Sequence, residues 1–162
     1  MSAMIRKGIR IFGAFLFGLY IAGLIYVLFF AESYGRGAEG IVYDYNICPF
    51  REIRRYVTYW RVLGIRTVIL NLAGNVIGFI PFGALLPLMA RSVRRWWKVT
   101  LLGFEISALI EVSQLIFKVG CFDVDDMILN TLGAFLGYLI FFAASRCYRR
   151  MEQNHRENKA VR

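Results

Sequence analysis

The chain has 162 residues, of which 58% are hydrophobic and 16% aromatic, and its formal net charge is +9. Its mean hydropathy of +0.52 is too high for a water-soluble domain, whose surface must carry charge. Most of the 20 Lys and Arg residues flank apolar runs, where anionic lipid headgroups would lie, so the charge does not indicate nucleic-acid binding. The composition therefore predicts a small integral membrane protein without a nucleic-acid partner.

The first apolar run, residues 11–30, contains no charged residue and follows Arg6, Lys7 and Arg10. A helix of about 20 apolar residues is long enough to cross a hydrocarbon core of about 30 Å. A cleaved signal peptide would have the same basic flank, but its apolar region is shorter and is followed by small residues, whereas this run ends in Phe29 and Phe30. We expect a transmembrane helix that is retained.

The loop that follows, residues 31–67, contains a segment with helical periodicity. Between residues 51 and 61, Ile53 and Tyr56 fall on one side and the arginines on the other, which predicts an amphipathic helix in the membrane interface. Its arginine and aromatic side chains could serve only as anchors. Alternatively, an arginine such as Arg51 binds a lipid phosphate or carboxylate through two parallel hydrogen bonds. The sequence does not separate these hypotheses.

Three further transmembrane helices are predicted, at about residues 68–89, 99–117 and 127–144. Four spans place both termini on one side of the membrane. The N-terminus, residues 91–98 and the tail from residue 146 are rich in Lys and Arg, whereas the loop before the last span carries Asp123, Asp125 and Asp126. Cytoplasmic loops carry the excess of Lys and Arg, so both termini are predicted to be cytoplasmic.

The sequence thus predicts an all-α fold, a polytopic membrane helical bundle of about four transmembrane helices with one interfacial amphipathic helix in the first outer loop. Residues 1–150 form a single transmembrane domain, and residues 151–162 form a polar cytoplasmic tail that we expect to be disordered. His155 lies alone in this tail, so we expect no catalytic or metal-binding role for it. A disulfide between Cys48 and Cys121 is conceivable, but isolated cysteines are more often small packed residues.

Polar side chains occur inside three of these spans, where each costs about 2.5–3.5 kcal/mol unless it faces another helix. Asn71 and Asn75 lie one turn apart, beside a pair of small residues, Gly74 and Gly78, that would allow a second helix to approach closely. The two amides are therefore candidates for a binding site. Simple hydrogen bonding between helices is the alternative interpretation.

Ser107, Glu111 and Gln114 share one face of the third span. Burial raises the pKa of a carboxyl group, so Glu111 could act as an acid or base or pair with an arginine. A neutral Glu111 that only bonds a neighbouring helix is the alternative. Glu111 is the strongest single candidate for a functional residue.

The fourth span begins at a cluster of aspartates. Asp123 is predicted to cap the helix N-terminus, and Asp125 and Asp126 in the first turn complement the helix dipole. Asp126 and Asn130 share one stripe with Gly133, so they face the same neighbouring helix.

Opposed to Glu111 and Gln114, this stripe would form a carboxylate-rich pocket near the outer leaflet. Such a pocket could bind a divalent cation through oxygen ligands, or amide and amine groups of a lipid-linked molecule. Acids scattered over two helices are a weak signal for a metal, so we expect neither a metal nor another cofactor.

Four ordered motifs carry a resemblance to a known family. They are Asn46-Ile-Cys-Pro49-Phe50-Arg-Glu-Ile53, Asn71-Leu-Ala-Gly-Asn75-Val-Ile-Gly-Phe79-Ile-Pro81-Phe82-Gly83, Glu111-Val-Ser-Gln114 and Asp123-Val-Asp-Asp126-Met-Ile-Leu-Asn130-Thr-Leu-Gly133. Over roughly residues 40–140, the chain resembles the VanZ-like membrane proteins associated with teicoplanin resistance. The resemblance implies an integral protein of the bacterial cytoplasmic membrane, in a family linked to tolerance of glycopeptide antibiotics. Family members often have an Arg shortly before the Phe-Asp pair, where this chain has Gly120 and Cys121, so its ligand or its affinity is expected to differ.

The leading hypothesis is a polar intramembrane pocket that binds an amphipathic envelope molecule, either a lipid-linked cell-wall precursor or a lipoglycopeptide antibiotic. Membrane lipids are the other expected partners, and the oligomeric state is left open. The candidate ligand-binding residues are Asn71, Asn75, Glu111, Gln114, Asp123, Asp126, Asn130 and Arg51. The first alternative is an enzyme that modifies an envelope lipid, with Glu111 and Asp126 as catalytic candidates. The second is a structural subunit whose polar residues only join helices.

Overall fold

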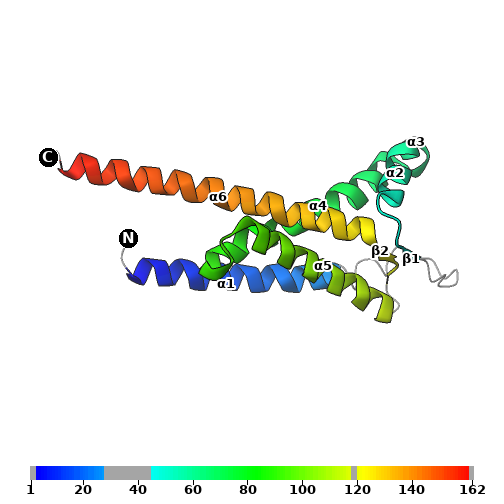
Figure 1. Cartoon of the computed structure of the whole chain (residues 1–162), viewed down its shortest axis with the longest axis horizontal. Coiled ribbons are helices and arrows are strands. Elements are labelled where there is room, and N and C mark those ends of the chain that lie inside the picture. Colours follow the sequence, from blue (N-terminus) through cyan, green and yellow to red (C-terminus); the bar gives the residue numbers. More distant parts are fainter. Residues whose placement is uncertain (1–2, 28–44, 118–119, 161–162) are drawn as a thin grey trace.

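The computed structural model describes residues 3–27, 45–117 and 120–160, and these ranges are almost entirely helical (Figure 1). The predicted all-α membrane bundle is confirmed. The elements in chain order are α1 (Ala3–Tyr26), β1 (Tyr45–Asn46), α2 (Arg51–Thr58), α3 (Trp60–Leu63), α4 (Ile65–Met89), the 3-10 turn η3 (Arg91–Val93), α5 (Trp96–Phe117), β2 (Phe122–Asp123) and α6 (Val124–Ala160).

Three of the helices, α4, α5 and residues Val124–His155 of α6, are long and apolar enough to cross a membrane. α1 adds a shorter apolar stretch, Ile11–Tyr26, and the predicted continuation of this span to Phe30 lies outside the described residues. Figure 1 shows the beginning of α1 and the end of α6 at the same end of the bundle, which we call the terminal end. The opposite end carries α2, α3 and the two strands, and we call it the loop end.

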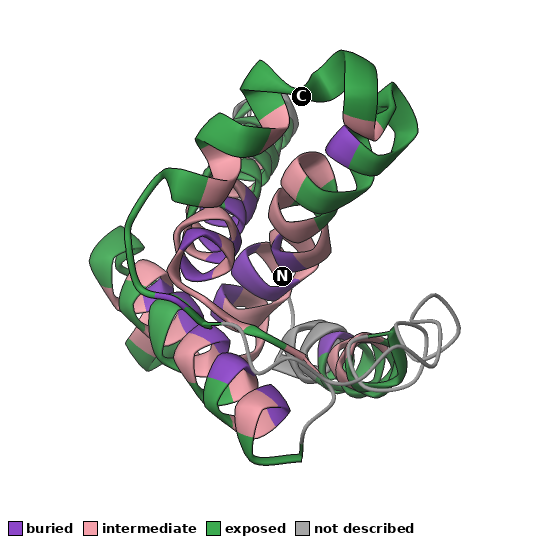
Figure 2. Cartoon of the chain, turned by 90° about the vertical axis from the view of Figure 1, so that its right-hand side faces the viewer, coloured by how far each residue is buried: buried purple, intermediate pink, exposed green. Residues whose placement is uncertain are grey.

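The core lies where α4 meets α6 and is covered by α1 on one side and by α5 on another. Figure 2 shows the buried residues on the faces that the helices turn toward one another. Phe79, Phe82 and Ala134 form the centre of this core. The ring of Phe17 from α1 packs 5.9 Å from the ring of Phe82, measured between centroids. The Tyr20 hydroxyl also donates a 2.8 Å hydrogen bond to the Gly78 carbonyl, so α1 is joined to α4 by packing and by polar contact.

Glycines allow α4 and α6 to touch backbone to backbone. A Cβ atom at Gly83 would collide with the Ala134 carbonyl, one at Gly133 with the Val76 carbonyl, and one at Gly137 with the Ile80 carbonyl. The predicted close-contact role of Gly74 and Gly78 was wrong, because nothing described lies within 4 Å of a Cβ placed at either position. The glycine of α4 that faces α6 is Gly83, further along the helix, where the two helices cross.

The structure differs from the sequence predictions at two other places. The interfacial helix predicted over residues 51–61 is interrupted at Tyr59, which separates α2 from α3. The tail predicted to be disordered from residue 151 instead continues α6 through Ala160, giving one helix of 37 residues. Its Met, Glu, Gln and Arg residues are good helix formers, and extending an existing helix requires no new nucleation. Cys48, Cys121 and Cys147 are all unpaired, so no disulfide joins Cys48 to Cys121.

Candidate functional site

The loop end is organised around the carboxylate of Asp125, in the first turn of α6. Asp125 is only 1% exposed, although it is an acid. Its Oδ2 atom accepts hydrogen bonds from the backbone amides of Glu52 at 2.7 Å and Ile53 at 3.1 Å, and its Oδ1 atom accepts one from the amide of Phe50. Amides in the first turn of a helix have no partner within that helix. Asp125 therefore caps the N-terminus of α2 from a distant part of the chain.

This contact fixes the start of α2 in an uncommon backbone conformation. Phe50, the residue before α2, has φ of 66° and ψ of 8°, in the left-handed region that residues other than glycine rarely adopt. Its own side chain makes no capping hydrogen bond. The hydrogen bond from the Phe50 amide to Asp125 therefore caps this end of α2 and compensates for the backbone strain at Phe50.

Asn46 and Asp123 join the loop before α2 to the beginning of α6. β1 and β2 pair in parallel, with Asn46 opposite Asp123. The Asn46 Nδ2 atom donates to Asp123 Oδ1 at 2.9 Å, and its Oδ1 accepts from the Cys48 amide at 3.2 Å. Asp123 Oδ1 also accepts from the Asp125 amide at 2.8 Å, which confirms the prediction that Asp123 caps α6.

Four of the remaining candidate residues are buried or half-buried and occupy helix junctions. Glu111 is 3% exposed, and its Oε2 accepts a 2.9 Å hydrogen bond from the Asp123 amide. The Asn75 side chain donates to Asp126 Oδ1 at 2.5 Å, which connects α4 to α6. Gln114 is buried on α5, where its side chain lies close to Gly120. Each of these polar groups therefore lies between two segments of the bundle.

Asn130 joins α6 to α5 deeper in the bundle. Its Nδ2 donates a 2.9 Å hydrogen bond to the Ser107 hydroxyl, and both residues are buried. Among the described residues, no buried polar side-chain atom lacks a hydrogen-bond partner. A buried polar contact that is fully satisfied stabilises one particular arrangement of helices.

The structure places the last two candidates, Asn71 and Arg51, on exposed surfaces. Asn71 donates to the Thr67 carbonyl of its own helix at 2.8 Å, so it does not join the polar residues between α4 and α6. Arg51 lies at the start of α2 and lines a cavity of about 420 Å³ at the loop end. The candidates therefore divide into a set between segments of the bundle, one residue at an open cavity, and Asn71, which belongs to neither.

The cavity has a basic wall. Arg51, Arg54 and Arg55 line it, together with Asn46, Glu52, Thr58 and Tyr59. The Arg55 guanidinium is paired with the Glu52 carboxylate at 2.9 Å. Arg51 and Arg54 make no ion pair with any residue that the structure describes. Within the described residues, these two guanidinium groups of the cavity wall are thus not neutralised by a carboxylate.

Sequence analysis missed the part that several residues play here. Asp125 was interpreted only as a complement to the dipole of α6, and Arg54, Arg55 and Asn46 were not selected. The sequence did contain one indication of these roles, because Asn46 and Asp125 lie within two of the motifs that resemble the family. In the described part of the chain, no group of three His, Cys, Asp or Glu residues is close enough to hold a metal ion.

Burial raises the pKa of the Asp123 carboxyl above its ordinary value of 3.8. Hydrogen bonds from the Asp125 amide and Asn46 oppose this shift, as does the charge of Arg55, whereas the charge of Asp125 adds to it. A carboxyl with a raised pKa in the folded state stabilises the fold below its unfolded-state pKa. This contribution is lost as the pH rises through the folded-state value.

Asp123→Asn is expected to remove this pH dependence, because an asparagine keeps the oxygen that accepts the Asp125 amide and carries no charge. The variant should gain free energy of unfolding relative to the wild type as the pH rises from about 3.5 to about 7. Unfolding of both proteins in the same detergent, followed by circular dichroism across this range, measures the difference. A difference that stays constant with pH would contradict the assignment.

A model of the VanZ/LLP1 family matches residues 17–145, well over half of the chain. The chain belongs to the VanZ/LLP1 family. Protein VanZ from Enterococcus faecium is 29% identical to it over 131 residues, which cover 78% of this chain and 71% of that protein. No solved structure matches the chain.

The range matched by the VanZ/LLP1 model includes the second part of α1, all of α2 to α5, and α6 as far as residue 145. It also includes Asp125, the three residues whose amides Asp125 binds, and every residue that lines the basic cavity. The resemblance predicted from the four sequence motifs is thereby confirmed, and the chain is a membrane protein of this family.

Proposed function

We propose that this VanZ/LLP1 protein binds the charged headgroup of an amphipathic envelope molecule in the cavity at the loop end. The ligand is either a lipid-linked cell-wall intermediate or a lipidated glycopeptide antibiotic of the teicoplanin type. The observation that carries the proposal is the cavity of about 420 Å³ with Arg51 and Arg54 in its wall. Its volume lies within the range of about 300–1,000 Å³ that is usual for small-molecule sites.

The chemistry of the cavity suits an anionic oxygen group. A guanidinium can donate two parallel hydrogen bonds to a phosphate or a carboxylate, and both ligand classes carry such groups. Arg51 and Arg54 lie three residues apart on α2, so their side chains start from neighbouring positions on one helix face. Because the Asp125 carboxylate fixes the start of α2, the two arginines are positioned before a ligand arrives.

The buried polar residues have a supporting part in this proposal. Asn75, Glu111, Asp126 and Asn130 hold α4, α5 and the beginning of α6 in register, and this arrangement places Asp125 beneath α2. The apolar tail of the ligand would remain in the membrane beside the bundle. With the basic residues at the terminal end on the cytoplasmic side of the bacterial membrane, the cavity faces outward, where both ligand classes occur.

The test compares the double variant Arg51→Gln/Arg54→Gln with the wild type. Purified full-length proteins in nanodiscs are titrated with teicoplanin and, separately, with a lipid-linked cell-wall precursor. At least one probe should bind the wild type, and the double variant should bind it about ten-fold or more weakly, because hydrogen bonds to charged groups contribute about 1.5–3 kcal/mol each. Complementation of a deletion strain by each protein, with teicoplanin susceptibility and membrane levels measured, reports the effect in cells.

Arg61→Gln is the matched control, because it removes the same charge from an exposed arginine of α3 that does not line the cavity. It should bind the probe and complement as the wild type does. Equal weakening by Arg61→Gln would show that only overall charge matters, and full activity of the double variant would refute the cavity as the binding site.

A further inference from the structure

A second cavity, entirely separate from the basic one, lies between the beginning of α5 and the middle of α6. It is a groove of about 400 Å³ lined by Trp96, Phe135, Tyr138, Leu139 and Phe142. The Trp96 and Phe135 rings meet edge to face with centroids 6.2 Å apart and form one wall. Leu139 and Phe142 are 42% and 40% exposed. The groove is therefore an apolar channel that opens on the surface of the bundle.

A cation lies at one end of this groove. Phe135, Leu139, Phe142 and Arg146 follow one another at spacings of four, three and four residues, so they form a single stripe along α6. The Arg146 guanidinium lies over the Phe142 ring, 5.1 Å from its centroid. The stripe thus leads from an aromatic floor directly to a positive charge, in the direction of the terminal end.

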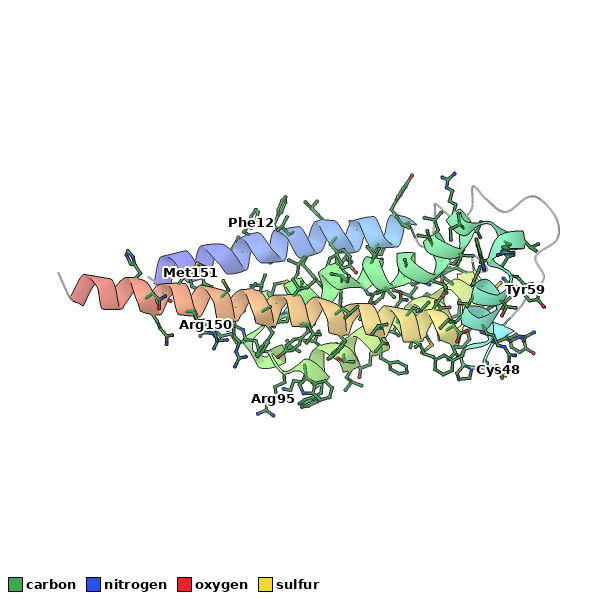
Figure 3. All side chains as sticks on the ribbon, turned by 90° about the horizontal axis from the view of Figure 1, so that it is seen from above. Phe12, Cys48, Tyr59, Arg95, Arg150 and Met151 are labelled. Atoms are coloured by element: carbon green, nitrogen blue, oxygen red, sulfur yellow. The ribbon has the colours of Figure 1, made fainter. Side chains whose placement is uncertain are left out.

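The chain segments that line the groove carry positive charge only. Residues 94–100 and 131–150, which contain the lining residues, include no Asp or Glu but six Lys or Arg residues. Arg95 immediately precedes Trp96, and Figure 3 shows it projecting from the surface in the half of the molecule that faces the terminal end. Figure 3 also shows Cys48 and Tyr59, which mark the loop end, at the opposite end of the bundle. An occupant of the groove would therefore meet cations at the membrane surface of the terminal end.

From this geometry we infer that the groove binds an anionic phospholipid of the leaflet at the terminal end. One acyl chain lies along Phe142, Leu139 and Phe135, and the phosphate meets the Arg146 guanidinium. Long apolar chains fill aromatic grooves by the same burial that stabilises protein cores, and a guanidinium binds phosphate through paired hydrogen bonds. This inference does not depend on the proposed function, because the two cavities share no residue.

Trp96 makes the inference directly measurable, because bromine atoms on a lipid acyl chain quench tryptophan fluorescence at short range. The chain has three tryptophans, and replacing the exposed Trp60 and Trp97 with Phe leaves Trp96 as the reporter. The full-length Trp60→Phe/Trp97→Phe protein is placed in phosphatidylcholine vesicles containing increasing fractions of brominated phosphatidylglycerol. A parallel series uses brominated phosphatidylcholine. Brominated phosphatidylglycerol should quench Trp96 at a several-fold lower mole fraction than brominated phosphatidylcholine.

Two charge variants of the Trp60→Phe/Trp97→Phe protein test whether Arg146 causes the preference for phosphatidylglycerol. Arg146→Gln should reduce the preference for phosphatidylglycerol by about five-fold, the effect expected of one basic residue at an anionic surface. Arg91→Gln removes the same charge from the exposed turn η3, which does not line the groove, and should leave the preference unchanged. The inference would be overturned if both lipids quenched the Trp60→Phe/Trp97→Phe protein equally. It would also be overturned if the two charge variants lost the preference for phosphatidylglycerol to the same extent.

Discussion

Asp125→Ala is expected to release α2 from the loop end and to lower the free energy of unfolding by about 3–5 kcal/mol. The substitution removes a buried carboxylate and leaves the amides of Phe50, Glu52 and Ile53 without a partner, at the end of a helix of only eight residues. Removing one side of a buried hydrogen bond costs about 1–3 kcal/mol, and more when one partner is charged. Thermal unfolding in detergent measures the loss of stability.

Hydrogen exchange tests the same prediction at the atoms concerned. The three amides should exchange far faster in the Ala variant, whereas Asp125→Asn, which keeps one acceptor oxygen, should give intermediate rates. Because the arginines of the basic cavity are carried by α2, the Ala variant should also bind the proposed ligand weakly. Unchanged exchange at these amides in the Ala variant would refute the capping role of Asp125.

Gly137→Ala is expected to be among the most disruptive single methyl substitutions in the bundle. A Cβ atom at this position would collide with the Ile80 carbonyl and lie 2.9 Å from the Ala84 amide nitrogen, and both belong to the backbone of α4. Neither helix can relieve the collision by rotating a side chain, so α4 and α6 must move apart along their whole contact. We expect a loss of about 3 kcal/mol, at the upper end of the usual cost of overpacking.

Gly74→Ala is the matched control for this prediction. It introduces the same methyl group on α4 where nothing described lies within 4 Å. Alanine is the better helix former by about 0.8–1 kcal/mol, so this variant should be as stable as the wild type or slightly more stable. Melting temperature in detergent and the level of each protein in membranes distinguish the two variants. Equal behaviour of the two variants would show that the close α4–α6 contact is absent.

Much of the fold could be predicted because the length of an apolar run is a local property. The predicted starts of the last three spans fall within three residues of the starts of α4, α5 and α6, and two of the three ends agree. Which face of a helix meets a neighbour is not a local property when the helix is apolar all round. Gly74 and Gly83 are both small residues in α4, and only the crossing with α6 distinguishes them.

The positions of the candidate residues could be found in part because a polar residue within an apolar run is also a local feature of the sequence. The sequence shows which polar residues lie within apolar runs, and of these Glu111, Asp126 and Asn130 lie at contacts between segments of the bundle, whereas Asn71 does not. The role of Asp125 depends on contacts with residues 72 to 75 positions earlier, which no local pattern reveals. The sequence does not distinguish Arg54 from the other arginines of the predicted interfacial helix, because its place at the cavity depends on where α2 lies relative to α6.

Because Asp125 lies far along the chain from the amides that it caps, α2 cannot be capped until well after its own residues have been synthesised. A ribosome adds about 5–20 residues per second, so Asp125 follows Phe50 by about 4–15 seconds. During this interval the segment that becomes α2 lacks its capping carboxylate and is exposed to proteases and chaperones on its side of the membrane. Nascent chains that end before residue 122 should therefore remain cleavable at residues 51–58, and protection should begin only when the last helix has been inserted.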